Sequence, residues 1–472
     1  MKLSSSPVTK KAVQPILLQL NYDAIPHSMF ILRDLLLSLQ APFSNTDLGR
    51  ERAHWFVFTL LAVIIPFTSS MTSNLLRSLR TLFGLDLGRR RFYTFMASST
   101  LPWDRLWCIL WGSIPRPLVD GRLLVVLDDS INNKTGRKIF GGGFFHDHTA
   151  KLNQPSYPWS QNIVSIGLLK IVKGRWICLP LAFRFYFMKK DIEANAPTAR
   201  KSGRTVEFRS KMVQAVEMLK AVAARFADTP VLVVADSWFG NDGLWRPLSE
   251  SAFAFQLLSR LRANITLYDH PTARAPAQRG RVRKYGERLG SASDMAGVYR
   301  QYARSLPVFL YGKTREVWAY DRMVMLKNLR RPVRVVWVFR QKRWVAFFTT
   351  DLTLSVEQVI EYYGARWKIE AGFREIKQEI GSAKSQTRNA HAVINHLNFC
   401  MMATTVTWIY ADRIKADPKR RHIVKGRTSF AFSDVRRLIA NAVLTEDFLC
   451  LWPSPHKSPN NSFVSILLRM VA

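Results

Sequence analysis

The sequence predicts a protein of the α/β class in which helical regions precede and follow a sheet. Continuous apolar runs at residues 122–130 and 230–240 each reach an aspartate, which is typical of strands buried on both faces. Between these runs, two apolar segments separated by Lys173 and Gly174 predict a hairpin, and residues 206–227 have a helical pattern. The expected order is three antiparallel strands, a helix and a further strand, with residues 253–261 as a fifth strand.

The charge of the chain favours a polyanionic partner. Lys and Arg total 69 against 34 Asp and Glu, a formal net charge of +35 over 472 residues. Nucleic acid is the expected partner, although a ribosome or a membrane surface would also satisfy charge alone. Since 48% of the residues are hydrophobic and 14 are Trp, the chain is globular, and its length suits two or three domains.

Several patterns predict a cytoplasmic protein with no membrane partner. The first residues lack the apolar run of a signal peptide, and residues 55–67 are fewer than the ~20 needed to span a bilayer, so they are expected to form a buried helix. The absence of a GxxxxGK[ST] loop argues against an ATP-driven motor. No CxxC pair is present, which argues against a zinc knuckle and favours a reducing compartment; the cysteines are Cys108, Cys178, Cys400 and Cys450.

Residues 355–381 are expected to form one helix of about seven turns. Ser355 and Gln358 match a capping box, and Gly381 is placed where a helix ends. Apolar residues fall on one stripe that would face the core: Ile369, Phe373, Ile376 and Ile380.

A second stripe of this helix is polar. Tyr363, Arg366, Glu370 and Lys377 fall within roughly 60° of one another at ~100° per residue. A polar line beside a buried face suits the wall of an active site. A solvated surface face fits the spacing equally well.

The same four residues resemble a family signature. Two, three and six residues separate them, as in the YREK motif of insertion-sequence transposases of the IS-four superfamily, and the surrounding YYGARWKIEAGFREIK is also similar to the family consensus. The resemblance covers roughly residues 120–400. It implies an RNase H-like catalytic core, cut-and-paste DNA transposition and a glutamate that completes a DDE triad. Some members of that family pass through a DNA hairpin.

The triad requires two aspartates upstream of Glu370. Asp236, directly after an apolar strand, is the second candidate. For the first, Asp128 and Asp129 are adjacent and point to opposite faces of a strand, so one of them is expected to reach the metal. Asp128 is preferred because Asp128 and Ser130 fit the family frame, and Asp129 is the alternative. Carboxylates of this kind hold two Mg²⁺ or Mn²⁺ ions in phosphodiester cleavage.

The resemblance assigns phosphate contacts to the rest of the signature. Arg366 would fork onto a phosphate, and Lys377 and Tyr363 would contact one as well. Packing of the tyrosine ring in the core, or an ion pair between Arg366 and Glu370, is the alternative.

Trp344 matches the position at which related enzymes receive a flipped base. Trp318 and Trp337 compete for that role, and simple strand packing of Trp344 fits equally well. His146 and His148 flank Asp147, but a zinc site normally needs four ligands, so a polar loop beside the active site is preferred.

Composition divides the chain into five predicted regions. They are a helical DNA-binding domain (1–115), the first part of the core (116–262), a β-rich basic insertion (263–350), the second part of the core with the glutamate helix (351–400) and a helical region suited to dimerisation (401–472). Basic residues of the first region are Arg77, Arg80, Arg89, Arg90 and Arg91; DNA-binding candidates in the insertion loop are Arg281, Arg283 and Lys284.

The resulting hypothesis is a DNA transposase of bacterial, nucleoid-associated location. It would bind the terminal inverted repeats of its element as double-stranded DNA, cleave them and join the 3′ ends to target DNA. A homodimer in a paired-end complex is expected. The alternative is a catalytically silent DNA-binding protein derived from a transposase, for instance an inhibitor.

Overall fold

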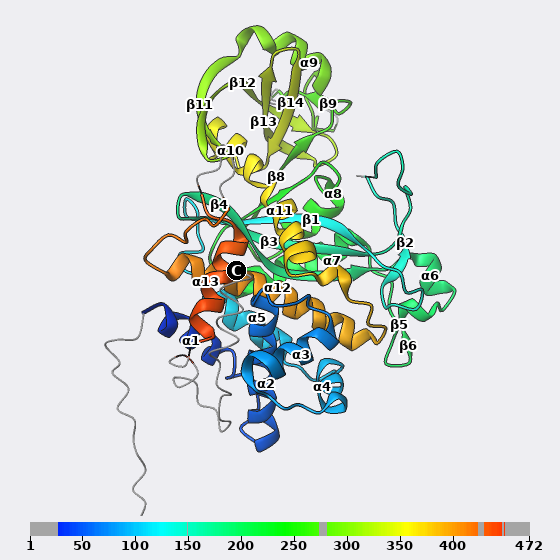
Figure 1. The fold of residues 1–472 in the computed structure, drawn as a ribbon. Helices are drawn as coiled ribbons and strands as arrows, with labels where there is room; N and C mark the ends of the chain where they lie inside the picture. Colours follow the sequence, from blue (N-terminus) through cyan, green and yellow to red (C-terminus); the bar gives the residue numbers. More distant parts are fainter. Residues whose placement is uncertain (1–26, 149, 273–280, 423–428, 446–447, 449–472) are drawn as a thin grey trace, which may run out of the picture.

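A computed structural model shows a mixed α/β fold built around one large sheet (Figure 1). It describes residues 27–148, 150–272, 281–422, 429–445 and 448, so both chain ends and Cys450 lie outside the described residues. The strands β11–β14 form the upper part of the molecule in Figure 1, and helices α1–α5 form the lower part. In chain order the helices are α1 (His27–Ser38), α2 (Asp47–Ile64), α3 (Thr72–Phe83), α4 (Arg89–Met96), α5 (Trp103–Gly112), α6 (Lys189–Glu193), α7 (Lys211–Arg225), α8 (Asp242–Ser249), α9 (Ala292–Tyr299), α10 (Val356–Ala365), α11 (Lys368–Arg374), α12 (Ala390–Arg413) and α13 (Phe432–Val443).

The sheet has the strand order β10-β9-β12-β13-β14-β8-β7-β1-β3-β2 within the described residues, with β11 added to β12 and β4 to β3. Its strands are β1 (Leu123–Asn133), β2 (Gly142–Phe144), β3 (Trp159–Val172), β4 (Arg175–Tyr186), β7 (Val231–Ala235), β8 (Phe255–Leu261), β9 (Thr266–Tyr268), β10 (Arg288–Ser291), β11 (Arg304–Leu310), β12 (Lys313–Leu326), β13 (Arg331–Arg340) and β14 (Arg343–Thr349). A separate pair is formed by β5 (Arg200–Lys201) and β6 (Arg204–Thr205).

The central strands follow the predicted order. β1 pairs antiparallel with β3, and β3 pairs antiparallel with β4. Lys173 and Gly174 make the turn between β3 and β4 with φ values of 48° and 74°, as a tight hairpin turn requires. After α7, strands β7 and β8 add parallel to β1 and to each other. The hairpin, the helix and the two later strands are therefore confirmed.

The inserted strands continue the central sheet and do not form a separate one. β14 pairs antiparallel with β8, with Ala346 opposite Leu261, and β13, β12 and β9 follow outward. The strands predicted in this region are confirmed, whereas α9 is an addition that the sequence patterns did not predict. Hydrogen-bonded strands thus connect the central part of the sheet with the insertion without interruption.

Different helices cover the two faces of the central strands. Because side chains alternate along a strand, Leu124 and Val126 of β1 pack in a cluster with residues of α10 and with Ile369 of α11. Leu123 and Val125 point the other way and belong to the cluster that includes α7. The face to which a residue of β1 points therefore determines which helix it meets.

The helices from the two ends of the chain form one layer. α12 packs against α1, α2, α4, α5 and α13. The indole Nε1 atoms of Trp103 and Trp107 donate to the side-chain oxygens of Asn395 and Asn398, at 2.7 and 2.8 Å. The predicted domain boundary between residues 400 and 401 falls inside α12, a continuous helix that is buried along almost its whole length.

Residues 55–67 include a buried part of α2, as predicted. Among the described residues, no helix is long and apolar enough to cross a membrane.

Residues 355–381 do not form the single helix that the pattern predicts. The capping box of Ser355 and Gln358 is present, and Gly381 ends the segment with a φ of 88°. Between them, α10 stops at Ala365, α11 starts at Lys368, and a π-helical turn follows over Glu375–Glu379. The break places Arg366 and Glu370 on opposite sides of a joint.

Glu375 lies buried in this π-helical turn, and its burial raises its pKa to about 8 although the Trp408 indole donates to its Oε2 at 3.0 Å. Between pH 4.5 and 8 the folded chain keeps a proton that the unfolded chain releases, so stability should fall as pH rises through this window. Glu375→Gln should remove this loss and be more stable than the wild type at pH 9, by at least about 1.4 kcal/mol, the equivalent of one pKa unit. Urea unfolding at pH 5, 7 and 9 measures the difference.

Glu361→Gln is the matched control, since Glu361 also accepts an indole N–H, from Trp176 at 3.1 Å, but is less buried. It should show a smaller dependence on pH. A Glu375→Gln curve parallel to that of the wild type would contradict the assignment.

Candidate active site

Two aspartates lie level with each other where the parallel pairing of β1 with β7 ends. Asp236 directly follows β7, whereas β1 continues past Asp128 to Asn133 because it stays paired with β3, so the predicted strand end at Asp128 is wrong. Leu127 of β1 is paired with Ala235 of β7, so Asp128 and Asp236 follow at the same height. Burial raises the pKa of Asp128 to about 7; Arg366 opposes the increase, and the Asp236 carboxylate contributes to it. Negative charge is therefore concentrated at this edge of the sheet.

Asp236 is held in a fixed orientation by the turn that follows it. Its Oδ1 accepts the backbone N–H groups of Trp238 and Phe239, at 2.9 and 3.0 Å. The Ser259 hydroxyl of β8 donates to the Asp236 carbonyl at 2.7 Å. These bonds position the carboxylate at the strand end without a contribution from the helix that carries Glu370.

Arg366 joins Asp128 to Glu370. Its Nη1 lies 2.9 Å from Asp128 Oδ2, and its Nη2 lies 3.2 Å from Glu370 Oε1. The arginine side chain is 8% exposed, whereas that of Glu370 is 41% exposed. Burial raises the pKa of Glu370, and Arg366 opposes that increase. The ion pair considered from the sequence is present, and it includes Asp128 as well.

Asp129 points to the opposite face of β1. Its Oδ2 accepts from Lys211 Nζ of α7 at 2.8 Å and from Asn162 Nδ2 of β3 at 3.0 Å. The alternation of side chains thus places Asp128, and not Asp129, beside Arg366. Lys211 and Asn162 had no signal in the sequence, because their role depends on which helix covers which face.

Lys377 lies beside the second half of β1. Its ammonium group donates to the Ser130 hydroxyl and to the Ile131 carbonyl, the latter at 2.7 Å. Burial lowers the pKa of Lys377 to about 8, and the carboxylates of Asp147, Asp129 and Asp128 oppose the decrease.

Tyr363 packs in the core, the alternative left open by its spacing. Its ring centroid is 4.3 Å from that of Phe347, and the Arg366 guanidinium lies 5.6 Å from the ring. Burial raises the pKa of the phenol. The Tyr363 ring is therefore a packing neighbour of the Arg366 guanidinium.

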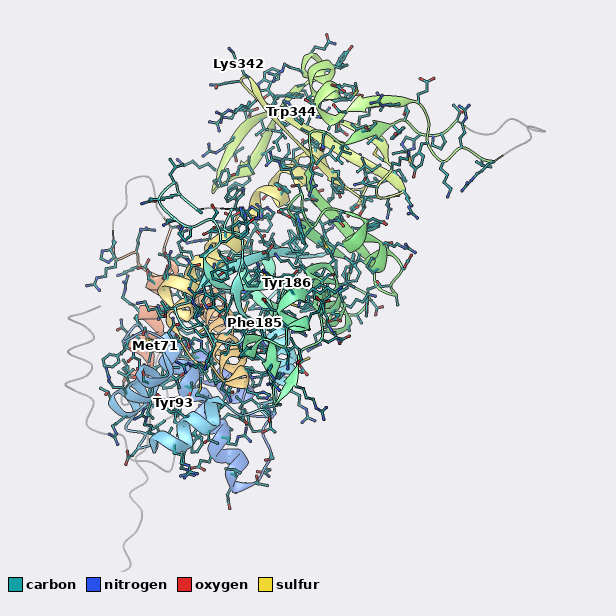
Figure 2. The ribbon with its side chains drawn as sticks, turned by 90° about the vertical axis from the view of Figure 1, so that its right-hand side faces the viewer. Met71, Tyr93, Phe185, Tyr186, Lys342 and Trp344 are labelled. Carbon is teal, nitrogen blue, oxygen red and sulfur yellow. The ribbon has the colours of Figure 1, made fainter. Side chains whose placement is uncertain are left out.

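Trp344 is not brought to the carboxylates. It is opposite Phe339 of β13, beyond the Ala346–Leu261 pair that joins the insertion to β8. Figure 2 shows it near Lys342 in the upper part of the molecule, above Tyr186 of β4. Trp337 is fully buried and Trp318 is 56% exposed, so of the two competitors only Trp318 offers a free ring face.

The predicted basic residues also lie away from the carboxylates. Arg281, Arg283 and Lys284 are exposed between β9 and β10, at the outer edge of the insertion strands. The N-terminal arginines are exposed on α3 and α4, where Arg80 pairs with Asp86 and Arg91 with Glu51. Their contact with DNA stays a prediction.

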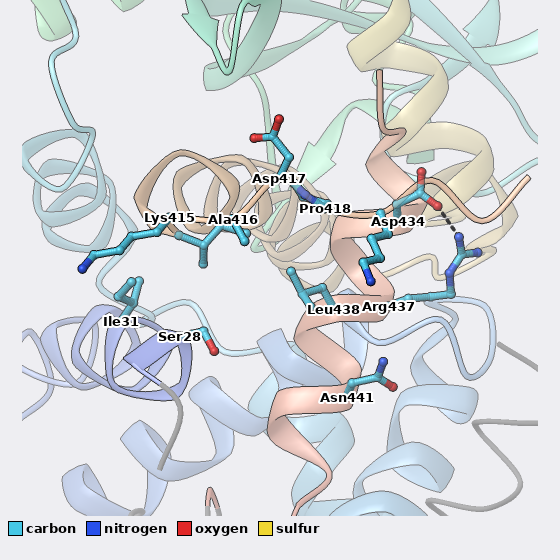
Figure 3. A pocket seen from close by; sticks show the side chains of 12 residues that line it. Ser28, Ile31, Lys415, Ala416, Asp417, Pro418, Asp434, Arg437, Leu438 and Asn441 are labelled. Atoms are coloured by element: carbon cyan, nitrogen blue, oxygen red, sulfur yellow. Dashed lines mark hydrogen bonds and ion pairs between the residues drawn. The ribbon is translucent and has the colours of Figure 1, made fainter. Parts of the chain in front are cut away.

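A cavity of about 660 Å³ lies elsewhere, between α1, α13 and the residues after α12 (Figure 3). Leu438 and Ile31 line it, together with the ion pair of Asp434 and Arg437. None of the predicted site residues lines it.

The donors at the carboxylate site have the chemistry of a divalent-metal site. Asp128, Asp236 and Glu370 offer hard oxygen ligands of the kind that Mg²⁺ and Mn²⁺ prefer, and the half-buried, mutually repelling pair of aspartates would be stabilised by a cation. Among the described residues, however, no three His, Cys, Asp or Glu side chains are gathered closely enough to hold an ion, and this includes the loop with His146 and His148. Arg366 supplies positive charge between two of the carboxylates.

The fold and these carboxylates define a nuclease-like α/β protein, and a family model agrees. The model described as DDE superfamily endonuclease matches residues 45–308, more than half of the 472-residue chain. The chain therefore belongs to this family, whose members use divalent metal ions. The match includes Asp128 and Asp236 and ends before Glu370.

Among solved structures, the chain is similar to the piggyBac transposase in its synaptic complex with hairpin DNA, determined by cryo-electron microscopy. The sequence identity is 11%, the TM-score is 0.43, and the alignment covers 93% of this chain and 82% of that one. No curated protein matches the chain.

Proposed function

We propose that this DDE endonuclease is a DNA transposase that binds the terminal inverted repeats of its element, cleaves them and joins the 3′ ends to target DNA. The observation that carries the proposal is the pair of level carboxylates on neighbouring parallel strands, Asp128 and Asp236, with Arg366 joining the first of them to Glu370. The spacing of Tyr363, Arg366, Glu370 and Lys377 supports the IS-four superfamily in particular.

The side chains have separable tasks in this proposal. Asp128, Asp236 and Glu370 would hold two divalent ions, which supply the positive charge that activates an attacking oxygen and stabilises a leaving one. The planar guanidinium of Arg366 is suited to binding two phosphate oxygens, and Lys377 is a point charge beside Ser130 and Ile131 of β1. The Tyr363 ring limits how far the Arg366 side chain can move into the core.

We further propose an RNase H-like core, a basic insertion and a dimer that holds two DNA ends. The strand order β4-β3-β1-β7-β8, with the last two parallel to β1, supports the core. The exposed cations between β9 and β10 favour DNA contact by the insertion, because they place positive charge on the surface of a chain whose net charge is +35.

A catalytically silent DNA-binding protein is the second candidate. The contact of Arg366 with both Asp128 and Glu370 favours it, since a protein that never binds metal gains from having these carboxylates neutralised internally. Asp128 and Asp236 argue against it, because two neighbouring carboxylates repel both each other and DNA phosphate.

Incubation of the protein with labelled DNA ends of its own element and Mn²⁺ separates the candidates. A transposase should give products on a denaturing gel that disappear with EDTA, and nicks or hairpins among them would identify the cleavage route. Retarded DNA in a mobility-shift assay with no cleavage under any divalent ion would support the silent binder.

A further inference from the structure

The Arg366 guanidinium occupies the position of a cation between two metal-ligand candidates. One of its terminal nitrogens contacts Asp128 Oδ2 at 2.9 Å and the other contacts Glu370 Oε1 at 3.2 Å. A divalent ion would need the same carboxylate oxygens. Metal and guanidinium are therefore competitors for Asp128 and Glu370.

The remaining contacts of Arg366 leave part of its binding capacity unused. Its Nε is buried without a hydrogen-bond partner in the described part of the chain. The guanidinium lies 5.6 Å from the Tyr363 ring and 5.5 Å from that of Trp367, which is exposed at the helix joint. A buried N–H without an acceptor costs free energy. Arg366 would therefore gain if it exchanged Asp128 and Glu370 for a group that accepts from more of its N–H donors, and a phosphate is such a group.

The helix joint separates the arginine from the glutamate that it contacts. Arg366 caps the end of α10, whereas Glu370 belongs to α11, which begins at Lys368. A change in the partner of Arg366 therefore does not require the helix that carries Glu370 to unwind. Glu370 is also the exposed member of the group, so DNA and metal would approach from its side.

We propose that Arg366 is the internal counter-ion of the carboxylate site in the DNA-free protein, and that a backbone phosphate of bound DNA draws it away and frees Asp128 and Glu370 for a divalent cation. DNA binding and metal binding then strengthen each other by the same factor. The inference rests on the proposed function. It adds that the affinity of the site for a divalent ion stays low until DNA is bound. Cleavage would then be restricted to protein that has bound its DNA ends.

The first test measures Mn²⁺ binding to the full-length protein without DNA, from the electron paramagnetic resonance signal of free Mn²⁺. Arg366→Gln should bind Mn²⁺ at least about tenfold more tightly than the wild type, within the usual range of coupling between sites. Lys211→Gln is the matched control: it removes a cation of equal charge that pairs with Asp129 on the opposite face. The control should change Mn²⁺ affinity much less. Equal gains in both variants would show that the effect comes from the lower net charge and would contradict a specific role of Arg366.

The decisive comparison of the second test uses the wild type alone. Mn²⁺ affinity of the wild type is measured with and without an uncleavable duplex of end sequence, and Mn²⁺ bound by the duplex alone is subtracted. The wild type should gain about tenfold from DNA, and Arg366→Gln, where it folds by thermal melting, should gain less because its carboxylates are already free. A wild-type affinity that DNA does not change would overturn the inference. Absence of cleavage with normal metal coupling would instead overturn the proposed function alone.

Discussion

Asp236→Asn and Asp128→Asn are each expected to abolish cleavage of element ends while leaving end binding intact. The substitution keeps the size of the side chain, and the backbone N–H bonds of Trp238 and Phe239 to residue 236 can still form through the amide oxygen. What is lost is a negative ligand for the metal ion. We expect a fall in cleavage rate of about 10³-fold or more, which corresponds to about 4 kcal/mol of transition-state stabilisation.

Asp129→Asn is the control that shows which of the two adjacent aspartates is the first metal ligand. Asp129 is the neighbour of Asp128 in sequence, but it contacts Lys211 and Asn162 on the other face of β1. Its substitution should retain most of the cleavage rate and show some loss of stability in a thermal melt. If Asp129→Asn lost cleavage and Asp128→Asn kept it, the assignment of the first carboxylate would be reversed. Gel retardation of the same labelled ends verifies binding in every variant.

The two strands that carry these aspartates could be predicted because their signal is local, although β1 does not end at Asp128 as expected but continues to Asn133, paired with β3. A run such as Leu123–Leu127 followed by acid depends on burial of both faces, which composition alone reveals. The helix start at Ser355 and the stop at Gly381 are local for the same reason, since a cap is a contact over three or four residues.

The interior of the 355–381 segment could not be predicted in this way. Arg366, at the break, contacts Asp128 in a strand 238 residues earlier, and Glu375 in the π-helical turn accepts from Trp408 of α12. Helical periodicity contains no information about such distant partners. The same limit applies to Trp344, whose distance from the carboxylates follows from the pairing of β14 with β8, and to the boundary at residue 400, which α12 crosses.

Lys170→Met is expected to destabilise the whole chain by about 3–5 kcal/mol, as the loss of one partner from a buried ion pair does. Lys170 Nζ on β3 lies 2.6 Å from Asp412 Oδ2 at the end of α12, and it also donates to the Pro115 carbonyl after α5. Both charged side chains are nearly inaccessible, at 4% and 6% exposed. The variant would leave the Asp412 carboxylate buried without a cation, whereas Lys170→Met with Asp412→Leu should recover most of the stability, because no charge then remains buried.

Lys173→Met is the control from the same hairpin, because its partner Asp417, at 3.2 Å, is 74% exposed, so water solvates the carboxylate when the lysine is lost. An ion pair with such an exposed partner contributes at most about 1 kcal/mol. Urea unfolding followed by circular dichroism and by tryptophan fluorescence measures all three variants. Since Lys170 connects the sheet with the helical layer from both chain ends, its loss should lower one common transition rather than separate the layer from the sheet. Equal losses of unfolding free energy for Lys170→Met and Lys173→Met would contradict a special contribution of the buried Lys170–Asp412 pair. Two separated transitions would instead show that the helical layer unfolds independently of the strands that hold Asp128 and Asp236.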